Sequence, residues 1–239
     1  MSRRQRIFGE GITYHVISNC NNGEFLFRES QDFRLFIRYL EEAKDKFSFD
    51  LHSYQLMQSH VHLILKTNAP AFLNVIMHWL CHSFAKHYNK IHHRKGHFWR
   101  DRYKAKIIDN DLYGLGCLRY VHRNPLEANM VEKIEDWPWS CYPFYAFGIK
   151  NKLITPLPSY LGLAHQEKSR QLIYQKWVET PFLSKETETH LFRSKLRGNS
   201  IRQNNIIRKE LKPFFDHLIH NSLIHTESAG HILSKFDRK

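Results

Sequence analysis

The chain has 239 residues, with 36 Lys and Arg against 23 Asp and Glu, so its formal net charge is +13. This charge indicates a polyanionic partner, although charge alone leaves DNA, RNA and a membrane surface open. No run approaches the ~18 apolar residues of a membrane span, and the four scattered cysteines lack zinc-binding spacing, so we expect a cytoplasmic protein with reduced thiols.

The first half of the chain is predicted to alternate between strands and helices. Runs of β-formers bounded by turn residues predict strands, and apolar residues at helical spacing predict helices. The strands are expected at residues 12–18, 50–57, 60–66 and 97–108. The helices are expected at residues 31–47, 71–91 and 110–123. This order is typical of an α+β fold in which an antiparallel sheet is backed by helices, as in ferredoxin-like or palm-type sandwiches.

The character of the chain changes near residue 150, where the Pro-broken stretch 151–159 reads as a linker. Beyond it, short amphipathic helices are predicted at residues 165–179, 184–196 and 199–212. We therefore divide the chain into a first domain (1–150), a helical C-terminal extension (151–215) and a flexible tail (216–239). The basic side chains of the extension could grip DNA or simply be solvated.

The histidines His60 and His62 flank Val61 in a predicted strand. Successive side chains of a strand alternate between its faces, so both imidazoles point the same way, ~6–7 Å apart. In that arrangement they can share one divalent metal. The alternative is a chance pairing, because the chain has 17 histidines.

A second pair, Tyr120 and Asn124, lies four residues apart on a predicted helix and therefore on one helix face. A phenol and an amide oxygen then point at one spot. The alternative is a half-buried tyrosine and a helix stop before Pro125. His122 is a rival metal ligand, but on a straight helix it points ~160° away from Tyr120.

Basic and aromatic residues interleave between residues 86 and 106, which is typical of proteins that bind single strands. The alternative is that Phe98 and Trp99 are core residues of the predicted strand. Arg3 and Arg4 could form an arm in a DNA groove or a disordered tip. The candidate DNA-binding residues are Arg3, Arg4, Lys95, Arg100, Arg102, Lys104, Lys106 and Arg123. Four of them, from Arg100 to Lys106, would alternate onto one face of the strand.

Five motifs resemble those of the REP-associated tyrosine transposases, a branch of the His-hydrophobe-His (HUH) single-strand transposases that use one tyrosine. They occur in family order and cover roughly residues 8–148. The motifs are Thr13-Tyr14-His15-Val16, Met57-Gln58-Ser59-His60-Val61-His62, Gly96-His97-Phe98-Trp99-Arg100-Asp101-Arg102, Tyr120-Val121-His122-Arg123-Asn124-Pro125 and Asp136-Trp137-Pro138-Trp139-Ser140.

The resemblance implies an HUH fold and a metal-dependent DNA transposase that cleaves and rejoins single-stranded or hairpin DNA, here palindromic REP-like repeats. Tyr120 would be the nucleophile and would form a 5′-phosphotyrosine intermediate. His60, His62 and Asn124 would hold Mg²⁺, with Mn²⁺ able to replace it. Asn19 stands where many relatives carry Arg, which departs from the family pattern.

Two other classes of function stay open. One is a non-catalytic binder of hairpin DNA or RNA, and the intact set of His60, His62, Tyr120 and Asn124 argues against it. The other is a metal-dependent phosphodiesterase that uses water instead of the tyrosine. Covalent attachment of DNA to the protein separates this class from a transposase. Both a monomer and a homodimer are compatible with the sequence.

Overall fold

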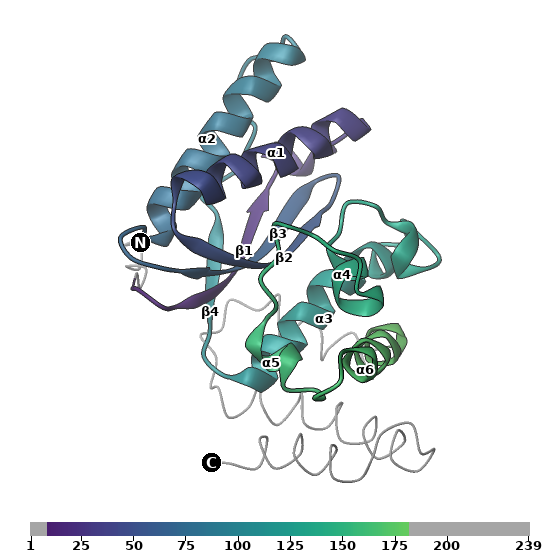
Figure 1. Ribbon diagram of the computed structural model, residues 1–239. Coiled ribbons are helices and arrows are strands. Elements are labelled where there is room, and N and C mark those ends of the chain that lie inside the picture. Colours follow the sequence, from purple (N-terminus) through teal and green to yellow (C-terminus); the bar gives the residue numbers. More distant parts are fainter. Residues whose placement is uncertain (1–8, 182–239) are drawn as a thin grey trace, which may run out of the picture. The chain divides into compact units, whose positions relative to one another are not determined.

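The computed structural model of the protein describes residues 9–181, which form two compact units (Figure 1). The sheet unit holds residues 9–108 and 151–155, and the tyrosine-helix unit holds residues 109–150 and 156–181. Within the described range, no helix is long and apolar enough to cross a membrane.

The sheet unit contains four strands and two long helices. The strands are β1 (Thr13–Asn19), β2 (Phe49–Leu56), β3 (His60–Thr67) and β4 (Lys104–Ile108). They pair antiparallel in the order β2-β3-β1-β4. The helices are α1 (Ser30–Lys46) and α2 (Leu73–Ile91). The predicted α+β class, with an antiparallel sheet backed by helices, is therefore confirmed.

The two faces of the sheet differ in chemistry. Val16, Leu63 and Leu65 are buried on the face that packs against α1 and α2, as the contact between Ser18 Oγ and Cys81 Sγ at 3.8 Å indicates. The opposite face carries the histidines, because residues on either side of a core residue in a strand point away from the core. The sheet thus separates a hydrophobic core from a face that carries polar side chains, among which His15 and His62 are buried.

A capping box marks the N-terminal end of helix α1. The Glu29 side chain accepts from the backbone of the first turn while Asp32 accepts from the backbone N–H of Glu29, which is a capping box. Phe36 of α1 and Phe84 of α2 meet edge to face with ring centroids 5.0 Å apart. This aromatic contact joins the two helices over the sheet.

The tyrosine-helix unit is built on α3 (Asp111–Glu127), with the helices α4 (Tyr142–Phe147), α5 (Pro158–Leu161) and α6 (Glu167–Glu179) around it. Asn110 caps α3 by accepting from the backbone N–H of Tyr113 at 2.8 Å. The helix continues past the stop expected at Asn124 and includes Pro125 in its last turn, where one N–H donor of the helix is missing.

Two further expectations differ from the structure. The predicted strand 97–108 is wrong before Lys104, where the chain is irregular. The interpretation of residues 151–159 as a linker is wrong for residues 151–155: Ile154 forms a parallel bridge with Leu51 of β2. The helix predicted at residues 165–179 is confirmed as α6. The helices predicted at 184–196 and 199–212 and the tail lie outside the described residues, and the domain division stays a prediction.

Candidate functional site

The two histidines of the predicted metal site lie together on β3. Their ring centroids are 4.8 Å apart and the rings are nearly perpendicular. His62 is buried, whereas His60 is half-buried and its Nδ1 lies 3.1 Å from Ser59 Oγ. The shared direction of the imidazoles, predicted from the alternation of the strand, is therefore present in the structure.

A third histidine, His15 of β1, joins this pair and was missed by the sequence reasoning as a site residue. Its Nε2 lies 3.0 Å from Nδ1 of His62, and the two rings stack with centroids 5.3 Å apart. Burial, assisted by the charge of Lys106, lowers the pKa of His15 to about 3, so this ring is neutral at pH 7. Its position in the β1 motif was visible in the sequence, but its contact depends on the register of β1 against β3.

Tyr120 and Asn124 lie on α3, and both are buried. The Asn124 Nδ2 donates to the backbone carbonyl of Tyr120 at 2.7 Å, which ties the amide to the tyrosine's own turn of the helix. The histidines belong to the sheet unit, and Tyr120 and Asn124 belong to the tyrosine-helix unit. A metal site built from both sets therefore stays a prediction.

The rival ligand His122 points into the core of the tyrosine-helix unit. Its Nδ1 lies 2.6 Å from the hydroxyl of Tyr174, and its Nε2 lies 3.3 Å from Sγ of Cys141. Burial lowers the pKa of His122 to about 3. Both ring nitrogens thus contact buried side chains, and His122 joins α3 to α6 rather than presenting itself to a metal.

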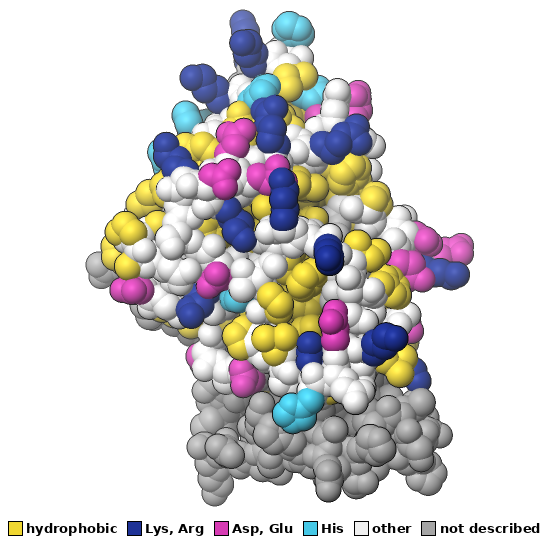
Figure 2. Space-filling model, in the orientation of Figure 1, with side chains coloured by type: hydrophobic (Ala, Val, Ile, Leu, Met, Phe, Trp, Pro, Cys, Tyr) yellow, Lys and Arg dark blue, Asp and Glu magenta, His cyan; other side chains and the backbone are white. Residues whose placement is uncertain are grey.

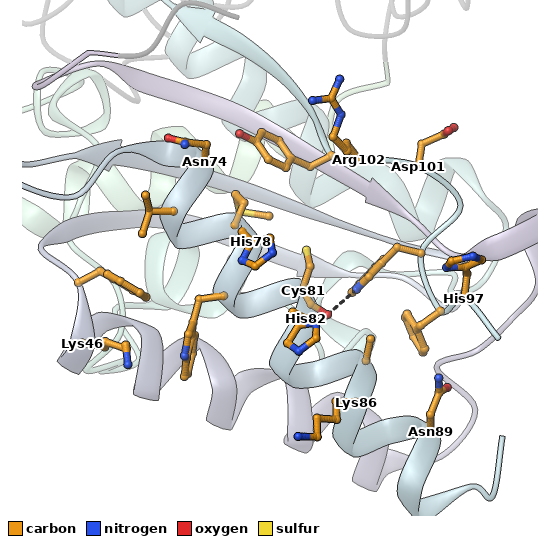
Figure 3. Close-up of a pocket in the computed structure, with 18 of the residues that line it drawn as sticks. Lys46, Asn74, His78, Cys81, His82, Lys86, Asn89, His97, Asp101 and Arg102 are labelled. Carbon is orange, nitrogen blue, oxygen red and sulfur yellow. Dashed lines mark hydrogen bonds between the residues drawn. The ribbon is translucent and has the colours of Figure 1, made fainter. Parts of the chain in front are cut away.

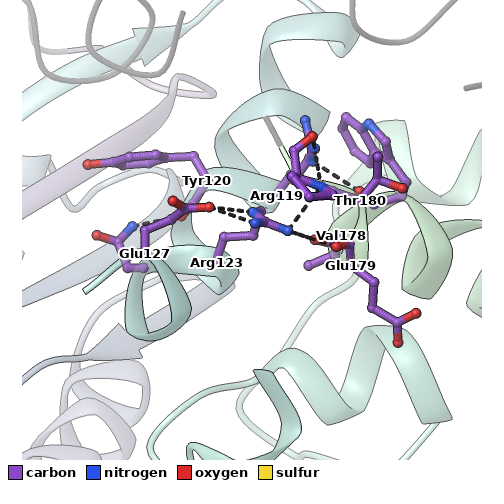
Figure 4. Close-up of polar contacts among 10 residues, drawn as sticks. Arg119, Tyr120, Arg123, Glu127, Val178, Glu179 and Thr180 are labelled. Atoms are coloured by element: carbon purple, nitrogen blue, oxygen red, sulfur yellow. Dashed lines mark hydrogen bonds and ion pairs between the residues drawn. The ribbon is translucent and has the colours of Figure 1, made fainter. Parts of the chain in front are cut away.

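Two arginines of α3 bind the C-terminal end of α6 (Figure 4). Arg119 Nε donates to the carbonyl of Trp177 at 3.0 Å, and Arg119 Nη2 donates to the carbonyl of Thr180. Arg123 Nη1 also donates to carbonyls at this end of the helix, with its contact to Thr180 at 3.0 Å. These guanidinium groups satisfy carbonyls that have no partner within the helix and complement the negative end of its dipole.

The predicted DNA-binding residue Arg123 is therefore a buried anchor. Its Nη2 lies 2.6 Å from Oε1 of Glu127, and its side chain is only 4% exposed. The guanidinium of Arg123 already has hydrogen-bond partners within the protein, which favours a structural role over a phosphate contact. The DNA contact of Arg123 stays untested.

The other basic candidates lie in or near the segment that precedes β4. Lys95, Arg100, Arg102 and Lys104 are exposed and Lys106 is half-buried, whereas Arg3 and Arg4 lie outside the described residues. Only Lys104 and Lys106 share a strand face, because β4 begins at Lys104. The predicted four-residue alternation is wrong, but the exposure of the cations agrees with a surface role. Figure 2 shows further Lys, Arg and His side chains over the far end of α2.

The aromatic residues of the same segment divide between two roles. Phe98 is 2% exposed and meets Phe84 edge to face, so its alternative reading as a core residue is confirmed. Trp99 is half-buried.

Among residues 9–181, no three His, Cys, Asp or Glu side chains form a metal-binding group, so an amide or water oxygen would have to complete a site at His60 and His62.

Comparison with known protein families gives a match over the first part of the chain. The model of the family described as "Transposase IS200 like" matches residues 9–124. Residues 9–124 are thus similar to the IS200-like transposases. The matched stretch contains β1 to β4 and ends at Asn124, so it includes the histidine pair and Tyr120. DNA transposase activity is the activity of this family.

The fold is also similar to that of solved structures. A solved structure of a REP-associated tyrosine transposase bound to a REP hairpin superposes with a TM-score of 0.53 at 18% identity, covering 66% of this chain and 96% of that chain. A second structure, from Deinococcus radiodurans R1, covers 57% of this chain and 98% of its own at 15% identity, with a TM-score of 0.37. Among curated proteins, the sequence has no match.

Proposed function

We propose that the protein cleaves and rejoins single-stranded or hairpin DNA through a covalent bond to Tyr120. The observation that carries this proposal is the contact of the His60 and His62 rings, 4.8 Å apart on β3, within a chain segment of the transposase family. The substrate class is proposed from the REP hairpin bound to the structural neighbour and from the positive charge of this chain. Palindromic repeats with single-stranded flanks are the expected form of the DNA.

The chemical step is a displacement at phosphorus. The phenol oxygen of Tyr120 forms a bond to phosphorus as the bond to the 3′ oxygen breaks, so the 5′ phosphate stays on the tyrosine and the strand gains a 3′ hydroxyl. The phenol gives up its proton to solvent, and the departing oxygen takes one. The phosphotyrosine ester keeps the energy of the cleaved bond, so attack by another 3′ hydroxyl reseals DNA and frees the tyrosine.

The donors fit a divalent metal. The imidazoles of His60 and His62 and the amide oxygen of Asn124 would hold Mg²⁺ in use, and the two nitrogen ligands suit Mn²⁺ at least as well. When bound, such an ion neutralises charge on the phosphate oxygens. His15 is a positioning residue in this proposal: it contacts His62 at Nδ1 and would orient that ring so that its Nε2 could bind a metal.

Exposed cations would hold the DNA backbone. We propose that Lys95, Arg100, Arg102, Lys104 and Lys106 contact phosphates, together with Arg3 and Arg4 from the N-terminus. We also propose that residues 1–150 form the transposase domain and that residues from 151 onward form its extension. The contacts of α6 with α3 indicate that this extension supports the tyrosine helix.

The deciding experiment is a covalent capture. Labelled DNA hairpins with randomised single-stranded flanks are incubated with the full chain and Mg²⁺ or Mn²⁺, and the protein is separated under denaturing conditions. We expect a labelled protein band that the Tyr120→Phe variant does not form. Strand cleavage without this band would indicate a water-using phosphodiesterase, and binding without cleavage would indicate a non-catalytic hairpin binder.

A further inference from the structure

Two exposed histidines of α2, His78 and His82, lie four residues apart on one face of the helix. Their rings are parallel within 3°, with centroids 5.9 Å apart. An open groove of about 1360 Å³ runs beside this part of α2, and both side chains line it (Figure 3). Solvent and dissolved ions therefore reach the two imidazoles together.

The pair differs from His87, which also lies on α2 but joins it to another helix. The Nδ1 of His87 lies 3.0 Å from the Tyr39 hydroxyl of α1. Within residues 9–181, neither His78 nor His82 makes a hydrogen bond or an ion pair. Their ring nitrogens are therefore open to a ligand from outside the protein.

Two imidazoles at this spacing are suited to share a metal ion, since histidines four residues apart on one helix face bind Zn²⁺ in metalloproteases. Imidazole nitrogen also suits Cu²⁺ and Ni²⁺. A shared ion needs one nitrogen of each ring at about 2.0–2.1 Å, so the rings must turn out of their parallel arrangement. The torsion that turns a histidine ring is soft and both side chains are exposed, so this adjustment costs little.

Cys81 lies between the two histidines in sequence but does not complete a site with three ligands. Its Sγ lies 3.8 Å from Oγ of Ser18 on β1, so the thiol faces the sheet. Burial raises the pKa of the Cys81 thiol to about 12, so it stays protonated at pH 7, whereas metals bind the thiolate. Among the residues that the structure describes, no three His, Cys, Asp or Glu side chains form a metal-binding group. The protein therefore supplies two ligands, and water would supply the others.

We propose that His78 and His82 form a second metal site that binds Cu²⁺, Ni²⁺ or Zn²⁺. It selects different ions from the proposed site at His60 and His62, because Mg²⁺ prefers oxygen ligands and Mn²⁺ stands lowest in the affinity order for such ligands. A bound ion links two successive turns of α2 on its exposed face. The inference goes beyond the proposed function and does not depend on it, since neither histidine takes part in the cleavage of DNA proposed above.

Calorimetry tests whether the two imidazoles share one ion. Ni²⁺ is titrated into the full chain without DNA, and every protein carries His60→Ala/His62→Ala so that the proposed nuclease site does not contribute. We expect His78→Ala and His82→Ala each to weaken Ni²⁺ binding about tenfold, because each removes the second attachment of the same ion. The variant with both substitutions should lose little more than either single variant. Unchanged Ni²⁺ binding in either single variant would overturn the shared site.

The matched control keeps the number of histidines but moves one of them. In His82→Ala/Lys86→His the two imidazoles lie about 12 Å apart along α2 and cannot share an ion. This variant should bind Ni²⁺ as weakly as His82→Ala. Lys86→Ala should instead bind about twofold more tightly, since it removes a positive charge one turn from His82. Wild-type Ni²⁺ affinity in the variant with the moved histidine would indicate unspecific capture by surface histidines and would contradict the proposal.

Footprinting locates the ion without relying on a variant. Diethyl pyrocarbonate modifies exposed imidazoles, and mass spectrometry identifies the modified residues with and without Zn²⁺. We expect Zn²⁺ to protect His78 and His82, while the exposed His93 and His97 stay reactive. Modification of His78 and His82 that Zn²⁺ leaves unaltered would refute the site. None of these measurements uses DNA, so their failure leaves the proposed nuclease standing, and the absence of a covalent DNA band leaves the metal site standing.

Discussion

Arg119 and Trp177 join the tyrosine helix to α6 through two contacts at once. The guanidinium donates to the Trp177 carbonyl at 3.0 Å, and its Cζ lies 5.3 Å from the centroid of the indole ring. The residue next to the proposed nucleophile is thereby fixed to a helix that begins 48 residues further along the chain, at Glu167. The extension is thus part of the support of Tyr120.

The neighbouring anchor Arg123 gives a first prediction. Arg123→Gln leaves the carboxylate of Glu127 without its partner at 2.6 Å, so the free energy of unfolding should fall by about 3 kcal/mol. Urea unfolding at pH 7 measures this loss, and Arg123→Lys, which keeps the charge but loses the forked geometry, should recover part of it. A variant of unchanged stability whose DNA binding has a shallower salt dependence would instead favour the predicted phosphate contact.

The second prediction concerns the nucleophile. Tyr120→Phe should abolish covalent capture of DNA, because no other atom of that side chain can form the phosphate ester. Hairpin affinity should stay within about threefold, which corresponds to about 0.7 kcal/mol and lies in the range for the loss of one hydrogen bond. Denaturing gels and anisotropy measure the two properties on the same preparation. Residual covalent product in the Phe variant would show that a different residue attacks the DNA.

The third prediction concerns the metal ligands and their support. The double variant His60→Ala/His62→Ala should lose Mn²⁺ binding in calorimetry, and Asn124→Ala should lose less because water can replace one ligand. His15→Ala should weaken Mn²⁺ binding about 10–100-fold through the orientation of His62, with partial recovery in His15→Gln.

The control for this series is His87→Ala, since His87 lies on α2 with its Nδ1 3.0 Å from the Tyr39 hydroxyl of α1. This variant should bind Mn²⁺ as the wild type does. Unchanged Mn²⁺ binding in the double histidine variant would contradict the proposed metal site. Unchanged Mn²⁺ binding in His15→Ala would indicate that His15 only packs against His62.

The fourth prediction concerns the exposed cations. Replacing Arg100, Arg102 and Lys104 with Ala should flatten the salt dependence of single-strand binding, because each lost phosphate contact removes ~0.7 from the log–log slope. Hairpins with single-stranded flanks should also bind more tightly than a blunt duplex, since stacking on aromatics needs exposed bases. Arg38→Ala on α1 removes an exposed charge and serves as the control. An unchanged slope in the triple variant would exclude this segment from the DNA interface.

The fifth prediction concerns acid stability. Burial lowers the pKa of His122 to about 3, against about 6.5 in the unfolded chain, so the unfolded state binds the additional proton between these values. The contribution of neutral His122 to the free energy of unfolding is therefore fully present above pH 6.5. It is lost as the pH falls toward 3, and the free energy of unfolding is about 2 kcal/mol lower at pH 5. His122→Gln should unfold more easily at pH 7 but show a smaller further loss at pH 5. A parallel pH profile in this variant would contradict the assignment.

The sequence predicted the sheet, the two long helices that pack on it and the shared face of His60 and His62, because these features depend on short periodic patterns. It could not predict the contact of His15 with His62, which depends on how β1 pairs with β3. The alternation of bulky and basic residues before Lys104 imitates a strand. In the structure Phe98 enters the aromatic core and Trp99 packs near α2, so tertiary contacts override that local pattern.

The bridge between Leu51 and Ile154 has a consequence for the order of folding. The sheet unit is discontinuous in sequence, since residues 151–155 return to the edge of β2, where Thr155 N donates to the carbonyl of Leu51 at 2.9 Å. A chain emerging from the ribosome, at about 5–20 residues per second, exposes this edge until residue 155 has been made. Until then the nascent β2 edge is open to pairing with another chain.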